Sequence, residues 1–471
     1  MLFSSVEFLY YFLPIVLAAY FITVLLRMPL RVQNSILLVS SLIFYAWGEP
    51  KFVILMVIQA FSAWFFGYLA DRFRGKKISK ISLTAALVVG IGGLIYYKYA
   101  DFFIGNFNIL FGANAPLLKL ALPLGISFYT FQALSYTIDV YRGDTAMQPN
   151  FFTFATYLTL FPQLIAGPIV RYTDVERELM TRKHSIQDFA GGARRFVIGL
   201  GKKVLIANVF GELVNIYHIS GNTSMLFAWL YVFAYSFHIY FDFSGYSDMA
   251  IGMGKMFGFK FLENFNYPFT AKSISDFWRR WHISMSTWFR DYIYIPLGGN
   301  RVKTGRFIFN TMVVWLITGF WHGAGWNFIT WGLYFGILML VEKFLLADIL
   351  ERLPSWIRRL YLALIILVSW TFFDSGSLQE TFGLISNMFS GSGGFFDSAA
   401  AYYFRSYAVL FAIAIIGCTP IPKKLAEKVS QKGWGKRVMT IAEPVFVSAL
   451  LLVVTAYLVD GSFNPFIYFR F

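Results

Sequence analysis

The chain has 471 residues, of which 58% are hydrophobic and 14% charged, and its mean hydropathy is +0.60. This composition excludes a soluble globular fold and predicts a membrane protein with many spans. The net charge of +15 is accounted for by basic cytoplasmic loops, so we expect no nucleic acid partner. A single cysteine, Cys418, excludes an internal disulfide and a cysteine-based zinc site.

Long apolar runs that do not alternate predict an all-α polytopic bundle of about 11 to 13 membrane-spanning helices, because roughly 20 apolar residues cross a bilayer. The first run lacks a basic n-region and a cleavage site, so we interpret it as a retained span. Several runs are short, and we expect some to be re-entrant or interfacial. In chain order the candidate spans are 6–26, 33–47, 51–70, 81–99, 117–140, 151–170, 198–219, 225–252, 307–321, 325–346, 360–374, 400–418 and 441–460.

Basic loops predict the orientation of the chain in the membrane. Residues 71–80 carry five basic residues and one acid, and residues 421–437 carry six basic residues and one acid, so both are expected to be cytoplasmic. Because three predicted spans precede the first loop and one follows the second, both chain ends are expected to be extracytoplasmic. The basic stretch 171–203 predicts a further cytoplasmic surface, and the Gly/Ser-rich loop at 390–394 is expected to be external.

We find no inverted repeat and no soluble domain in the sequence, and therefore predict one membrane domain. Within it we distinguish N-terminal helices over 1–140, a core over 141–346 and C-terminal helices over 347–471.

The predicted span 225–252 carries polar residues that need an explanation at membrane depth. His238 and Asp242 lie four residues apart and therefore on one helical face. One interpretation is a buried pair that orients neighbouring helices. The other is that Asp242, Ser244 and Asp248 line a functional cavity.

Residues 276–292 predict one continuous amphipathic helix. On a helical wheel its basic face carries Arg279, His282, Ser286 and Arg290, and its aromatic face carries Phe277, Trp281, Met285, Trp288 and Tyr292. An alternative interpretation is an interfacial helix that lies flat among lipid headgroups. Pro296 and the glycines that follow it end the segment.

The next apolar run leads to a histidine at membrane depth. It starts at Phe307 and continues for about 15 residues, which carries a helix roughly 22 Å into a core about 30 Å thick. His322 follows, among Gly319, Gly323 and Gly325, which permit a break in the helix. Irregular backbone at this depth is tolerated only against protein or a cavity, so we expect His322 to line a cavity as a general base. A hydrogen-bonded packing role is the alternative.

At these residues the chain resembles the membrane-bound O-acyltransferase (MBOAT) family, in particular its branch of bacterial polysaccharide and alginate O-acetyltransferases. Among the segments that carry the resemblance are LPLGISFYTFQALSYTIDVYRGD, YFDFSGYSDMAIGMGKMFGF, DFWRRWHISMSTWFRDYIYIPLGGNR and GFWHGAGWN. The resemblance implies a helical bundle around a central funnel, with His322 as the catalytic histidine and His282 as the second functional position. The branch of teichoic acid D-alanyltransferases is similar but differs around RDYIYIPLGGNR.

The resemblance also implies the substrates and the location. Acetyl-CoA is the expected acyl donor, on the cytoplasmic side of a bacterial inner membrane, with no permanently bound cofactor and no metal. An extracytoplasmic SGNH-type partner is expected to pass the acetyl group to a polysaccharide. Candidate substrate contacts are Trp278, Trp281, Trp321, Asn327, Asp242, Ser244 and Asp248. Candidate phosphate contacts are Arg279, Arg280, Arg290, Arg301 and Lys303, for which a membrane-surface role is the alternative.

Two other classes of function are compatible with an apolar chain of this kind. A transporter of polysaccharide precursors would move its substrate without acetyl-CoA. A non-catalytic scaffold would leave His282 and His322 replaceable.

Overall fold

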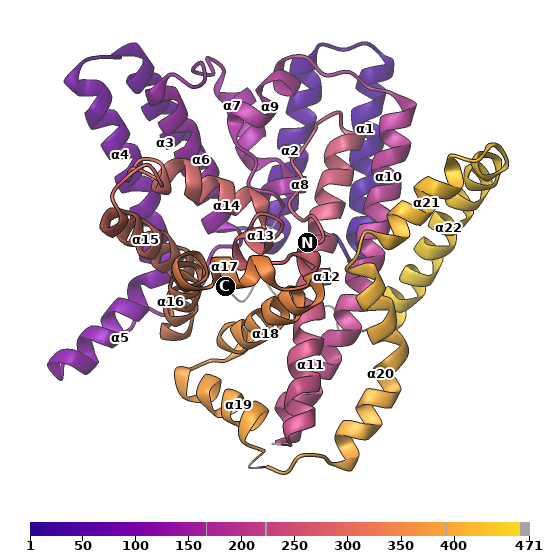
Figure 1. Ribbon diagram of the computed structural model, residues 1–471. Coiled ribbons are helices and arrows are strands. Elements are labelled where there is room, and N and C mark those ends of the chain that lie inside the picture. Colours follow the sequence, from indigo (N-terminus) through magenta and orange to yellow (C-terminus); the bar gives the residue numbers. More distant parts are fainter. Residues whose placement is uncertain (166, 222–223, 392, 462–471) are drawn as a thin grey trace. The chain divides into compact units, whose positions relative to one another are not determined.

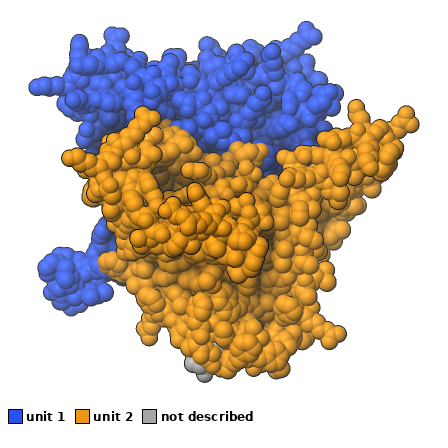
Figure 2. Space-filling model, viewed as in Figure 1, with its two compact units in different colours: residues 1–196, 246–262 blue, residues 197–245, 263–471 orange. Residues whose placement is uncertain are grey.

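The structure is a computed structural model that describes residues 1–165, 167–221, 224–391 and 393–461, and these residues form helices and no strand. The predicted all-α class is therefore confirmed. Ala166, in one predicted span, and Ser392, in the predicted external loop, lie outside the described residues. The chain divides into two compact units (Figure 2): unit 1 is residues 1–196 with 246–262, and unit 2 is residues 197–245 with 263–471.

Seven helical segments of the described chain are long and apolar enough to cross a membrane, so this is a multi-pass membrane protein. Each coincides with a predicted span. The other predicted spans also form helices in whole or in part, but these are shorter or more polar, so fewer segments qualify than the 11 to 13 expected. The seven are Phe8–Leu25, Phe52–Arg72, Lys77–Phe111, Met225–Met256, Ser355–Asp374, Ser398–Gly417 and Gly433–Asp460.

Unit 1 contains the N-terminal helices (Figure 1), and π- and 3-10 helices are labelled η. Two long helices, α10 (Ile186–Gly201) and α12 (Met225–Met256), contribute residues to both units. The elements of unit 1 alone are η1 (Phe8–Phe12), α1 (Leu13–Leu25), α2 (Leu30–Gly48), α3 (Phe52–Arg72), α4 (Lys77–Leu94), η2 (Ile95–Tyr99), α5 (Ala100–Phe111), α6 (Ile126–Arg142), α7 (Phe151–Thr159), α8 (Phe161–Leu164) and α9 (Tyr172–Met180).

Two predicted spans in unit 1 differ from the structure. The segment predicted over 117–140 is helical only from Ile126, because Gly125 adopts a left-handed φ of 72° that a continuous helix does not permit. The segment predicted over 151–170 is interrupted at Leu160, whose ψ of 109° separates α7 from α8. Pro162 lies in the first turn of the second helix, where a proline is tolerated.

Unit 2 contains the C-terminal half of the chain, including every histidine-bearing segment that we associate with function. Its elements are η3 (Lys202–Ala207), α11 (Asn208–Ser220), η4 (Pro268–Thr270), α13 (Ile274–Trp278), α14 (Ile283–Phe289), η5 (Arg290–Tyr294), α15 (Thr304–His322), α16 (Trp326–Val341), η6 (Glu342–Leu346), α17 (Ala347–Arg352), α18 (Ser355–Asp374), α19 (Leu378–Ser390), α20 (Ser398–Gly417), α21 (Ile421–Ser430) and α22 (Gly433–Asp460).

The prediction of one continuous amphipathic helix over 276–292 is wrong. Helix α13 ends at Trp278, and His282 adopts a left-handed conformation with φ 45° and ψ 54° before α14 begins. The cause is a competing partner segment: the backbone N–H of Ile283 donates to the Asn264 carbonyl, and that of Asn266 donates to the Arg280 carbonyl. These bonds replace those of a helix, so His282 does not share one face with Arg279 and Arg290.

Helices α15 and α16 pack side by side along small residues (Figure 1). A Cβ atom on Gly332 would lie 2.3 Å from the Trp315 carbonyl oxygen, and one on Gly319 would lie 2.3 Å from the Phe328 carbonyl oxygen. The two backbones therefore approach more closely than any larger residue permits. This contact holds the C-terminal end of α15, where His322 lies, against the start of α16.

We expect Gly332→Ala to lower the free energy of unfolding by about 1–3 kcal/mol, because the added methyl group overpacks the α15–α16 contact. Thermal unfolding of the purified protein in detergent measures the change. The matched control is Gly305→Ala on α15, since a Cβ atom at Gly305 meets nothing within 4 Å. Equal melting temperatures for the two variants would contradict the close contact.

Candidate active site

His322 is the last residue of α15, and the chain turns there into extended backbone at Gly323, where φ is −166°. The predicted break at the glycines is confirmed. The imidazole is buried, and its ring centroid lies 5.0 Å from each of those of Trp321, Trp331 and Phe373. Aromatic rings of the protein therefore surround this histidine at the C-terminal end of α15.

His282 is fully buried and is oriented by Asn264. The Asn264 side-chain oxygen accepts from the backbone N–H of Ser284 at 3.2 Å and from its hydroxyl at 2.9 Å, and lies 3.2 Å from His282 Nδ1. Because an oxygen can only accept here, Nδ1 carries the proton and Nε2 carries the lone pair. His282 lies between candidate spans, and burial lowers its pKa from 6.5 to about 3, so the ring is neutral.

The indole of Trp321 connects the two histidines. Its ring centroid lies 5.0 Å from that of His322 and 6.1 Å from that of His282. Two residues that are forty positions apart in the sequence therefore lie against one aromatic side chain. The fold therefore brings His282, Trp321 and His322 together in one candidate site.

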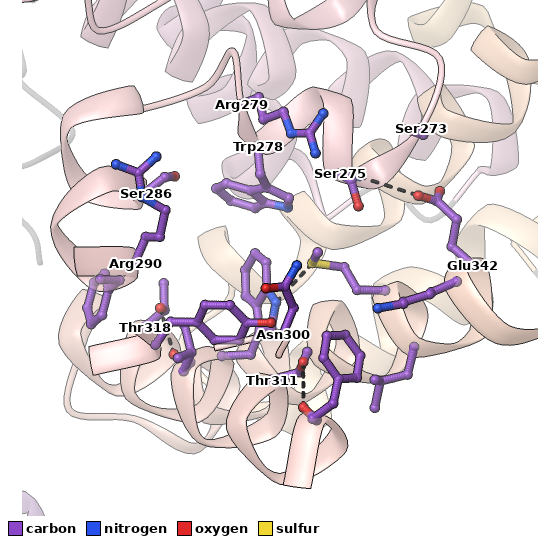
Figure 3. Close-up of a pocket in the computed structure, with 18 of the residues that line it drawn as sticks. Ser273, Ser275, Trp278, Arg279, Ser286, Arg290, Asn300, Thr311, Thr318 and Glu342 are labelled. Atoms are coloured by element: carbon purple, nitrogen blue, oxygen red, sulfur yellow. Dashed lines mark hydrogen bonds between the residues drawn. The ribbon is translucent and has the colours of Figure 1, made fainter. Parts of the chain in front are cut away.

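A cavity of 850 Å³ lies in unit 2, and Trp278 is among the residues that line it (Figure 3). Neither histidine is among the described residues that line it. Trp278 lines the cavity and its ring centroid lies 5.5 Å from that of Trp331, which in turn lies 5.0 Å from that of His322. Two aromatic side chains in series thus connect the cavity with His322. Polar residues around the cavity include Ser273, Ser275, Arg279, Ser286, Arg290, Asn300, Thr311, Thr318 and Glu342.

The five predicted phosphate contacts differ in their surroundings. Arg279 lines the cavity and has no acidic partner within 4.0 Å in the described part of the chain. Arg290 also lines it, but its guanidinium makes two bonds to Asp291, at 2.7 and 3.2 Å. Arg280 instead pairs with Asp276 at 2.8 Å. The exposed residues Arg301 and Lys303 are not among the lining residues.

Sequence reasoning missed two further cations of the cavity, Lys343 and Arg358. They lie in η6 and α18, far along the chain from the arginine-rich segment, and no motif marks them. It also missed Glu342, whose carboxylate accepts from the backbone N–H groups of Ile274 at 2.9 Å and Ser275 at 3.4 Å. Glu342 thereby fixes the start of α13, the helix that carries Trp278.

Several predicted substrate contacts have partners within the protein. In unit 2, Asp242 forms a buried ion pair with Lys203 at 2.5 Å. In unit 1, Asp248 pairs with Arg195 at 2.8 Å. The amide of Asn327 donates to two backbone carbonyl oxygens at the end of α18, at 3.1 and 2.8 Å, so it joins α16 to α18.

The remaining two predicted contacts, Trp281 and Ser244, are both buried. The Trp281 ring lies 5.2 Å from that of Trp370 and stacks on Phe277 at 5.5 Å. Neither Trp281 nor Ser244 is among the described residues that line the cavity.

Comparison with known proteins finds one matching family and several similar proteins. Residues 145–372 match the model of the membrane-bound O-acyltransferase family. The chain is 40% identical to the protein named "Probable alginate O-acetylase AlgI" of Azotobacter vinelandii, over 83% of this chain and 78% of the relative. It is 34% identical to the peptidoglycan O-acetyltransferase of Helicobacter pylori, over 83% and 80%. It is 32% identical to the teichoic acid D-alanyltransferase of Bacillus subtilis, over 59% and 71%.

We expect Asn264→Ala to destabilise the protein by about 1–3 kcal/mol, because buried donors of His282 and Ser284 lose their acceptor. Thermal unfolding in detergent measures the loss. Ser284→Ala removes one donor and leaves the contact between Asn264 and His282 in place, so it should cost only about 0.5–1.5 kcal/mol. A loss in Asn264→Ala no larger than in Ser284→Ala would show that Asn264 does not hold the turn.

Stability should fall as the pH is lowered below about 6.5. In that range the unfolded chain protonates His282 while the folded chain, with a pKa of about 3, does not, so the unfolded state binds more protons and acid favours it. His282→Gln removes this contribution. We expect the melting temperature of the wild type to drop more than that of His282→Gln between pH 7.5 and 5.5; parallel drops would contradict the buried neutral ring.

Proposed function

This chain belongs to the membrane-bound O-acyltransferase family, and we propose that it transfers acetyl groups from acetyl-CoA for the O-acetylation of an extracytoplasmic polysaccharide. As a member of the family it is an O-acyltransferase. Relatives named for O-acetylation of alginate and of peptidoglycan align with most of the chain, which favours an acetyl group and a glycan acceptor. The observation that carries the proposal is the buried pair of histidines around Trp321, next to a cavity lined by cations.

The cavity supports acetyl-CoA as the donor. Its volume of 850 Å³ lies within the range of about 300–1,000 Å³ that is usual for small-molecule sites. Arg279, Lys343 and Arg358 supply positive charge for the phosphates of the donor. The apolar wall at Trp278 suits the uncharged acyl end. The donor is consumed in each turnover and is not a resident cofactor.

His322 is proposed as the general base. It takes the proton from a hydroxyl of the acceptor as that oxygen attacks the thioester carbonyl carbon. The new C–O bond forms, the C–S bond breaks, and the CoA thiolate leaves and takes the proton from the His322 imidazolium, which restores the base. His282, whose Nε2 accepts hydrogen bonds, orients a donor group of a substrate and is not suited to stabilising an oxyanion. The surrounding rings keep water from hydrolysing the thioester.

The proposed location is the cytoplasmic membrane of a bacterium, with the donor on the cytoplasmic side. The basic segments 71–80 and 421–437 support this orientation, with both chain ends on the outer side. The acceptor hydroxyl then belongs to the polysaccharide itself or to the serine of an SGNH-type relay partner on the outer side. CoA cannot cross hydrocarbon, so the acyl group alone passes through the protein.

D-alanyl transfer to teichoic acid is the second candidate, supported by the similarity to the Bacillus subtilis enzyme over 59% of the chain. The chemistry at His322 would be the same, with a D-alanyl thioester as the donor. A comparison of acetyl and D-alanyl thioesters as donors for the purified protein separates the two.

Purified protein should transfer label from acetyl-CoA to an added polysaccharide acceptor or relay protein. We expect His322→Ala to lower the rate by about 10²–10⁴-fold, which is the usual contribution of a general base. The control is His218→Ala, since His218 is a half-exposed histidine of unit 2 that pairs with Asp374. Acetylation by His322→Ala at the wild-type rate would rule out the proposed base.

A further inference from the structure

Three indole side chains pack together between the cavity and His322, but their N–H groups differ. The Trp315 N–H donates to the Met339 sulfur at 3.0 Å. The N–H groups of Trp278 and Trp331 are buried and have no acceptor among the described residues. Buried indole N–H groups normally find a partner, so these two require an explanation.

The two unsatisfied donors lie in series from the cavity to the candidate base. Trp278 lines the cavity, its ring centroid lies 5.5 Å from that of Trp331, and Trp331 lies 5.0 Å from His322. Trp278 is only 6% exposed and Trp331 only 1%. A ligand that extends from the cavity to His322 would therefore pass both N–H groups in turn.

The lack of acceptors has an energetic consequence. A buried donor without a partner costs about 1–3 kcal/mol, and contacts of an N–H with a neighbouring ring recover only part of this. The interplanar angle of 84° between Trp278 and Trp331 permits such a weak contact. A ligand that brings two carbonyl oxygens to this place would satisfy both donors.

We propose that Trp278 and Trp331 bind the pantetheine arm of the acyl donor, an inference that rests on the proposed function. The Trp331 N–H donates to the thioester carbonyl oxygen, and the Trp278 N–H donates to the adjacent amide carbonyl oxygen. A two-carbon link between sulfur and nitrogen separates these carbonyl groups by about 6 Å on ordinary bond lengths, close to the spacing of the two rings. Trp331 then stabilises the negative charge that develops on the thioester oxygen during attack.

The test compares Trp331→Phe, Trp278→Phe and Trp315→Phe, each of which keeps an aromatic ring and removes one N–H. Two ligands are used: acetyl-CoA as substrate, and S-ethyl-CoA, a thioether without the thioester carbonyl, as competitive inhibitor. We expect Trp331→Phe to lower kcat with acetyl-CoA about 100-fold while the inhibition constant of S-ethyl-CoA stays within twofold.

The other two variants complete the comparison. We expect Trp278→Phe to weaken acetyl-CoA and S-ethyl-CoA alike, about tenfold, because both carry the amide. Trp315→Phe loses a hydrogen bond to Met339 and should lower the melting temperature while weakening each ligand less than twofold. If Trp331→Phe does not fold, the tenfold weakening of both ligands in Trp278→Phe, compared with less than twofold in Trp315→Phe, carries the test.

Two outcomes count against the inference and have different meanings. If the wild type turns over acetyl-CoA but Trp331→Phe and Trp278→Phe respond to the two ligands as Trp315→Phe does, the indoles are packing residues and only this inference fails. If the wild type does not turn over acetyl-CoA, the proposed function fails, and the inference fails with it.

Discussion

The side-chain oxygen of Asn264 is the group on which the arrangement of the site depends. It accepts from the backbone and hydroxyl of Ser284 and from His282, and thereby holds a left-handed turn in a sequence whose periodicity is helical. In the helical alternative His282 would share a face with Arg279 and Arg290. The turn instead moves the imidazole away from those arginines and against Trp321. A neutral, oriented ring is the result, and this is the form that can take part in proton transfer or hydrogen bonding.

The sequence predicts those features that depend on local patterns. The lengths of apolar runs predict the long apolar helices, and the glycines around His322 predict the end of α15. The turn at His282 could not be predicted in this way, because its partner Asn264 lies eighteen residues earlier and competes with helix formation only in the folded protein. For the same reason the partner of Asp242 was missed: Lys203 lies in another helix, and no periodicity relates the two.

In unit 2 the buried carboxylate of Asp242 and the two buried imidazoles have different surroundings. Asp242 is paired with Lys203, because a carboxylate in an apolar interior requires a counter-charge. The two imidazoles are placed among aromatic rings instead, since a neutral ring can be buried without a counter-ion. Apolar surroundings of this kind exclude water, which protects a thioester from hydrolysis. They also limit the polar groups available to orient a substrate, so each remaining donor or acceptor has a larger effect on orientation.

The distance between His322 and Trp331 is set by backbone packing as much as by the side chains themselves. Gly332 follows Trp331 directly and lies against the backbone of α15 at Trp315 and Gly319. A larger residue at this position would push α16 away from α15 and would carry Trp331 away from His322. Close approach of two helices through small residues is a general means of association in membranes. Here it has a specific consequence, because the same contact that joins the helices also places an indole beside the proposed base.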